Sequence, residues 1–196
     1  MFYRRKLILS LLQTFGGKIE KDRFQNLLFL FARRQQKPEY DFVPSRVSCY
    51  SFSANADIET MMKKGMLKEK DQFITRTDKE DYIEQLQPED RAILPEIKSE
   101  YGKMNVENLM RYIFHNYPFY AIKSDIAEKI LGKKELKKVK EAQPKRRGTI
   151  LFTIGYQGIS PEEYLVRLLQ HDIKVLVDVR NNPLSMKFGF SKNQLK

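Results

Sequence analysis

Apolar residues recur every three or four positions in residues 3–15 and again in residues 21–36. This spacing places them on one face of a helix, so each run predicts a helix. The second run is apolar on most sides between residues 24 and 31, as expected for a central, buried helix. Pro38 and Pro44 frame a stretch that is predicted to be extended, because the residue before a proline avoids the helical region.

A third helix is predicted to begin at Ser53 or Asn55, since either side chain can cap a helix, and to end at Gly65. Residues 68–77 alternate loosely between polar and apolar side chains, which predicts a short hairpin. Asp78 is expected to cap a further helix.

Three helices followed by a hairpin is the order of a winged helix-turn-helix, so we predict such a domain for residues 1–87. Residues 63–67 and 73–75 resemble the end of the recognition helix and the wing of these domains. Residues 27–30 and 57–67 also resemble the SocA-like, or Panacea, antitoxin domain, although Ser48 stands where that pattern has a glycine.

The middle of the chain, residues 88–143, is predicted to be helical. Asn105 can cap a helix over residues 106–117, and Ser124 can cap one over residues 125–131. A linker is predicted at residues 143–148, because proline, glycine and like charges oppose compact structure there. A third region is therefore expected over residues 144–196.

That third region reads as strand, turn, helix and strand. Residues 149–154 and 173–179 are strongly apolar, as parallel strands covered on both faces are. Between them, Ser160 and Glu163 form a capping box around Pro161, which suits the first helical position. The sequence thus predicts a β-α-β unit, and for the whole chain a mixed α+β fold that is mostly α.

In such units, ligands bind in the crevice beyond the carboxyl ends of the strands. Candidate ligand-binding residues at this crevice are Gly155, Tyr156, Gly158, Ser160 and Asn181. Asp178 and Arg180 are the catalytic candidates, because a carboxylate and a guanidinium at a strand end suit a phosphate or sugar ligand. Two residues apart on a strand, they share a face and are equally expected to pair with each other.

The motifs T-I-G-Y-Q-G-I-S, V-L-V-D-V-R-N-N-P-L-S and K-F-G-F-S-K resemble the opening of the family called domain of unknown function 488, over roughly residues 150–196. This resemblance implies a larger α/β domain with further strands and a motif that bears cysteine and histidine. The α/β domain is therefore expected to be incomplete here, and this chain alone is not expected to turn over a substrate.

The distribution of charge along the chain bears on the kind of partner expected. The chain has a net charge of +11, with nine Lys and Arg against two Asp and Glu in residues 1–37 and eight against two in residues 132–148. Such a balance favours DNA or another polyanion as partner. The candidate nucleic-acid-binding residues are Arg4, Arg5, Lys6, Arg33, Arg34, Lys63 and Lys64.

Other chemistry is sparse. A single cysteine, Cys49, excludes an intramolecular disulfide and fits a cytoplasmic protein. His115 and His171 do not complete a zinc-ligand pattern, so no metal and no cofactor is predicted. No apolar run approaches the roughly 20 residues of a membrane span, so no membrane partner is expected.

Three functions remain open: a DNA-binding winged helix joined to an effector domain, an enzyme acting on nucleotides or nucleic acid at the predicted crevice, and an antitoxin-like interaction module. The β-α-β unit offers more apolar surface than one helix covers. We therefore expect it either to self-associate or to dock onto the helices of residues 106–131.

Overall fold

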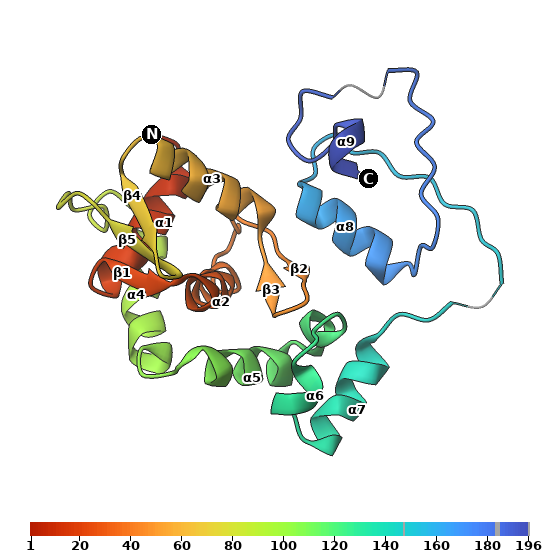
Figure 1. Cartoon of the computed structure of the whole chain (residues 1–196), viewed down its shortest axis with the longest axis horizontal. Coiled ribbons are helices and arrows are strands. Elements are labelled where there is room, and N and C mark those ends of the chain that lie inside the picture. Colours follow the sequence, from red (N-terminus) through yellow and green to blue (C-terminus); the bar gives the residue numbers. More distant parts are fainter. Residues whose placement is uncertain (147, 183–184, 196) are drawn as a thin grey trace.

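The computed structural model describes residues 1–146, 148–182 and 185–195. Three helices build the N-terminal region: α1 (Tyr3–Thr14), α2 (Lys21–Ala32) and α3 (Phe52–Lys63). Every residue of α2 from Phe24 to Ala32 is buried, so the predicted central helix is confirmed. Figure 1 shows α2 between the strands β1 and β3, with α5 on its other side.

A small antiparallel sheet lies beside these helices. It has the strand order β1 (Lys18–Glu20), β5 (Phe73–Arg76), β4 (Leu67–Lys70). Ile19 faces Ile74 in the register, and both side chains are buried. Asp71 and Gln72 connect β4 to β5 with positive φ angles of 52° and 68°, the conformation of a tight hairpin turn. The hairpin β4–β5 was predicted, whereas β1, the third strand of the sheet, was not.

A second sheet, with two strands, lies between α2 and α3 along the chain. It pairs β2 (Val43–Pro44) with β3 (Cys49–Tyr50). The extended stretch predicted before Pro44 is present, but its partner strand β3 was not predicted. The connection between α2 and α3 is therefore much longer than the short turn of a simple helix-turn-helix.

The middle of the chain is helical, as predicted, and packs on α2. Its elements are α4 (Pro88–Tyr101), α5 (Val106–Asn116), the 3-10 helix η1 (Pro118–Ala121), α6 (Ala127–Ile130) and α7 (Lys133–Ala142). The side chain of Asn105 accepts from the backbone N–H of Asn108, so the predicted cap of α5 is confirmed. The buried side chains of these middle helices share one apolar core with the N-terminal helices.

Aromatic rings join the middle helices to α2. Phe29 makes edge-to-face contacts with Phe42, Tyr117 and Tyr120, at centroid distances of 5.3, 5.2 and 4.6 Å. This geometry stabilises aromatic pairs beyond their buried area. These aromatic residues are thus part of the core.

Three predicted helix starts are wrong. Ser124 caps no helix over residues 125–131, because α6 begins at Ala127 with Ile126 at its N-cap position and has no side-chain cap. α3 is capped by Ser51, whose side chain accepts from the N–H of Ala54, and not by Ser53 or Asn55. Asp78 caps no helix, because its carboxylate accepts hydrogen bonds from Arg76 and from the hydroxyl of Tyr82. These bonds hold residues 77–87 as an irregular segment.

The C-terminal region contains the predicted helix but not the predicted strands. α8 (Pro161–Gln170) begins at Ser160, which accepts from the N–H of Glu163. Residues 149–154 and 173–179 form no strand, so the β-α-β unit is a wrong prediction for the described residues. Two strands and one helix would leave one sheet face uncovered, and Val175 and Val177 are 75% and 71% exposed. The short helix α9 (Lys192–Leu195) follows.

Among the described residues, the main contacts of α8 are with α3 and β2, and not with the helices of residues 106–131 as predicted. Figure 1 shows the first turns of α3 and α8 meeting, while the chain between α7 and α8 loops away from the rest. Arg147 of the predicted linker and Pro183 and Leu184 of the family motif lie outside the described residues. The fold is mixed α+β and mostly α, as predicted. Within the described residues, every helix is too short or too polar to cross a membrane.

Candidate nucleic-acid interface

Helix α3 presents one polar stripe to the surface. Ala54, Ile58 and Met61 face the core. Ser53, Ala56, Thr60 and Lys63 follow one another at helical spacing and lie on another face. This stripe ends in Lys63 and Lys64, which are both exposed. The cationic end of α3 thus lies next to the start of the hairpin β4–β5.

A buried carboxylate fixes two arginines of α1 beside α3. Asp57 Oδ2 lies 2.6 Å from Arg4 Nε, and Asp57 Oδ1 accepts from Arg5 Nε at 2.7 Å. The Asp57 side chain is only 2% exposed, against 41% for Arg4 and 14% for Arg5. The hydroxyl of Tyr40 lies 3.0 Å from Asp57 Oδ2, and burial together with this carboxylate strongly raises the pKa of Tyr40. Asp57 therefore positions both guanidinium groups at the edge of α3.

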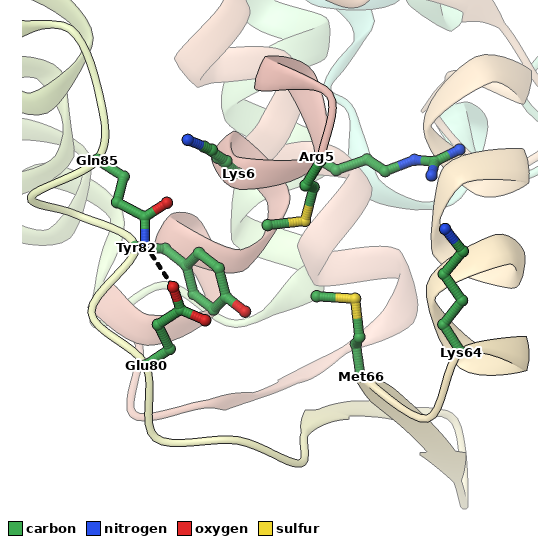
Figure 2. A pocket seen from close by; sticks show the side chains of 8 residues that line it. Arg5, Lys6, Lys64, Met66, Glu80, Tyr82 and Gln85 are labelled. Carbon is green, nitrogen blue, oxygen red and sulfur yellow. Dashed lines mark hydrogen bonds between the residues drawn. The ribbon is translucent and has the colours of Figure 1, made fainter.

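Next to this pair is a surface hollow of about 420 Å³, which we call the basic hollow. Three of its lining side chains are cations: Arg5, Lys6 and Lys64. Figure 2 shows Lys6 on α1 and Lys64 at the end of α3 on either side of it. Glu80 is its one lining carboxylate among the described residues, and it accepts from Gln85 Nε2 at 2.7 Å. The positive charge of this surface is thus only partly balanced.

The hairpin adds cations that the sequence reasoning missed. Lys68 and Lys70 on β4 are exposed, whereas Glu69 between them pairs with Lys21. Their period of two along a strand places both lysines on one face. The alternation of lysines along this predicted strand could have identified them as surface cations.

Arg33 and Arg34 contact other elements. Arg34 forms ion pairs with Glu96 and Glu100 of α4. The guanidinium of Arg33 lies 5.2 Å from the ring centroid of Tyr117. The structure therefore brings Arg4, Arg5, Lys6, Lys63 and Lys64 towards α3 and places Arg33 and Arg34 against the helical middle.

Asp178 and Arg180 pair with each other, which was one of the two expectations for them. Arg180 Nε and Nη2 lie 2.7 and 2.6 Å from the two carboxylate oxygens, and this hydrogen bonding lowers the pKa of Asp178. The Arg180 guanidinium also stacks 5.2 Å from the Tyr156 ring centroid, and Tyr156 stacks on Phe190. Lys187, which the sequence reasoning missed, approaches the same two rings.

The remaining crevice candidates do not gather with this pair. Gly155, Gly158 and Asn181 are exposed, and Ser160 donates to Asp41 Oδ2 at 2.7 Å. The strands that would have aligned them are not formed. These residues therefore do not enclose a crevice.

Glu162 is the least exposed carboxylate of the C-terminal region, at 0%. Its oxygens accept from the Ser51 hydroxyl at 3.1 Å, the Ser53 N–H at 2.6 Å and the Ser53 hydroxyl at 3.0 Å. In sequence it looks like an ordinary acidic residue in the first turn of a helix, so its partners could not be foreseen. The burial of Asp57 could have been foreseen more easily, because it is a lone carboxylate on the apolar face of α3.

Metal or thiol chemistry finds little support. Within the described residues, no group of three or more His, Cys, Asp and Glu side chains is placed to hold a metal ion. The thiol of Cys49 is buried, and burial raises its pKa to about 12. It is therefore a poor nucleophile.

Residues 160–196 match the sequence profile of the family described as Domain of unknown function DUF488. The resemblance noted from the motifs is confirmed for this segment. The chain matched no curated protein and no solved structure. The family match therefore covers α8, the Asp178–Arg180 pair and α9, and leaves the cationic face of α3 outside it.

Proposed function

We propose that residues 1–87 form a winged helix that binds DNA, with α3 as the recognition helix and the hairpin β4–β5 as the wing. The observation that carries this proposal is the third strand of the sheet. β1, which directly follows α1, pairs with β5 of the hairpin. The order expected of a winged helix is a helix, a strand, two helices and a hairpin. Here the strand β1 and the hairpin β4–β5 form one three-stranded sheet, which fits that order.

The charges of the proposed face support this assignment. Arg5, Lys6 and Lys64 surround the basic hollow, and Lys68 and Lys70 extend the positive surface along β4. Phosphate contacts from such cations dominate DNA affinity and make it dependent on salt. The hairpin β2–β3, inserted before α3, departs from a minimal winged helix and packs against α2 and η1.

The test is the double variant Lys63→Ala/Lys64→Ala. We expect weaker binding to double-stranded DNA at low salt, and a slope of log affinity against log salt that is smaller by about 0.9 for each lost phosphate contact. Fluorescence anisotropy with a labelled duplex measures both quantities.

A matched control removes two exposed lysines from α7. Lys133→Ala/Lys134→Ala has the same net charge as the test variant but lies on the helical middle of the chain. Equal weakening by both variants, or an affinity that does not respond to salt, would contradict the proposal. If an acidic polypeptide competes with the chain better than double-stranded DNA does, an acidic protein partner is favoured instead.

A further inference from the structure

The C-terminal region rests on α3 through one buried carboxylate. Glu162, in the first turn of α8, accepts three hydrogen bonds from Ser51 and Ser53 at the start of α3. The neighbouring Ser160 bonds to Asp41, just before β2. Hydrogen bonds to an ionised acceptor are roughly twice as strong as neutral ones, and Glu162 accepts three across this interface where Asp41 accepts one, so Glu162 is its main polar contact.

The electrostatic role of Glu162 follows from the two helices that meet there. The amino ends of α3 and α8 both carry partial positive charge and would repel each other at close range. The carboxylate lies at both helix starts and compensates them together. Removing it would leave two like-charged helix ends and the polar groups of two serines without their acceptor.

The docked region lies beside the stripe on α3 and contacts it at Ser53. Ser53, Ala56 and Thr60 line a second hollow of about 360 Å³, whose other wall includes Pro161 and Lys187 of the C-terminal region. Lys63 and Lys64, farther along α3, remain exposed. The first turn of α3 is therefore in contact with the C-terminal region, which faces Ala56 and Thr60 across this hollow, while the cationic end of α3 is open.

We propose that Glu162 is a detachable latch that holds the C-terminal region over the DNA-binding face of α3. In the docked state, its carboxylate occupies the helix start that a DNA phosphate would take, since helix amino ends bind both kinds of anion. DNA and α8 then compete for one surface, and the C-terminal region is autoinhibitory. This inference rests on the proposed DNA-binding function.

The interface is suited to release. Helix α8 contributes few buried apolar side chains to it. Tyr164 is buried, whereas Leu165 is exposed. Polar interfaces between parts of one chain are typical of reversible docking. The described part of residues 143–149 forms neither helix nor strand, so the two regions are joined by irregular chain.

The experiment compares Glu162→Ala with Glu163→Ala in the full chain. Both variants lose one negative charge in the same helical turn, but Glu163 pairs only with Arg167 of its own helix among the described contacts. We expect Glu162→Ala to bind a labelled DNA duplex at least about tenfold more tightly than wild type, because the competent state is no longer masked. Glu163→Ala should change the affinity by less than about twofold, the size of a general charge effect.

Hydrogen exchange on the same proteins tests the latch without DNA. Glu162→Ala should speed exchange at the amide of Ser53, and Glu163→Ala should not. Equal DNA affinities for the two variants, or unchanged exchange at Ser53, would overturn the latch. If neither wild type nor Glu162→Ala binds DNA while Ser53 exchange does respond, the DNA-binding proposal fails and the docking contact stands without its competitive role.

Discussion

At the scale of single residues, buried carboxylates organise this protein. Asp57 and Glu162 are almost fully buried, and each is surrounded by donors from other elements. A buried charge is tolerated only when it is paired or hydrogen-bonded. Asp57 orders the arginines of α1 at the candidate interface, and Glu162 joins α8 to the start of α3.

We expect Asp57→Asn to lower the free energy of unfolding by about 2–3 kcal/mol, because it leaves two arginines without their buried counter-charge. The loss is below that of a fully buried pair, since Arg4 keeps 41% of its side chain exposed. Chemical denaturation in urea measures it.

Asp125→Asn is the control for this prediction. It removes the ion pair with Arg46, in which both side chains are more than half exposed. Such pairs contribute less than about 1 kcal/mol. Similar losses for the two variants would show that Asp57 is not an organising charge.

At the scale of elements, α8 provides the platform on which the rest of the C-terminal region packs. Tyr164 and Phe190 meet edge to face at 5.2 Å, and Phe190 stacks on Tyr156 at 5.0 Å. The turn before Phe190 passes close over Pro161, at the start of α8. A side chain at Gly189 would place its Cβ 2.6 Å from Pro161 Cβ.

Gly189→Ala should therefore loosen this turn. Gly189 and Gly158 have positive φ angles of 84° and 76°, so alanine at either position carries a similar backbone cost of about 1 kcal/mol. Only at Gly189 does the new methyl group also clash, which should add about 1–3 kcal/mol. Hydrogen exchange at the Phe190 amide measures the difference, and equal effects of the two alanines would exclude this packing contact.

At the scale of the whole molecule, the buried apolar core contrasts with two exposed apolar segments, residues 149–154 and 173–179. The core runs through the N-terminal and middle helices from Leu7 to Val139. In the C-terminal region, Leu151 and Val179 are 92% and 88% exposed. Exposed apolar residues at alternate positions of extended chain can pair with another chain. Self-association through this region therefore stays a prediction.

We expect wild type to associate as its concentration rises, and Val175→Asp/Val177→Asp to reduce this association, because charges oppose strand pairing between chains. Sedimentation velocity over a concentration series measures it. Gln157→Asp/Gln170→Asp adds the same charge at exposed polar positions of the same region and should not reduce association. A wild type that remains monomeric throughout would contradict the prediction.

The sequence alone determined the features that depend on neighbours along the chain. The three N-terminal helices, the β4–β5 hairpin, and the caps at Asn105 and Ser160 were predicted, because helical periodicity and capping are local. The motifs of the C-terminal region likewise identified its family resemblance without any tertiary information. The separation of basic blocks from an acidic middle was also readable directly.

The tertiary structure alone decided what those elements meet. β1 joins the sheet only because Ile19 finds Ile74 more than fifty residues later, and such pairing leaves no local pattern. Residues 149–154 and 173–179 have the composition of strands, but strand formation needs a partner that covers both faces. Glu162 became the acceptor for α3 through docking between segments far apart in sequence, which no spacing rule predicts.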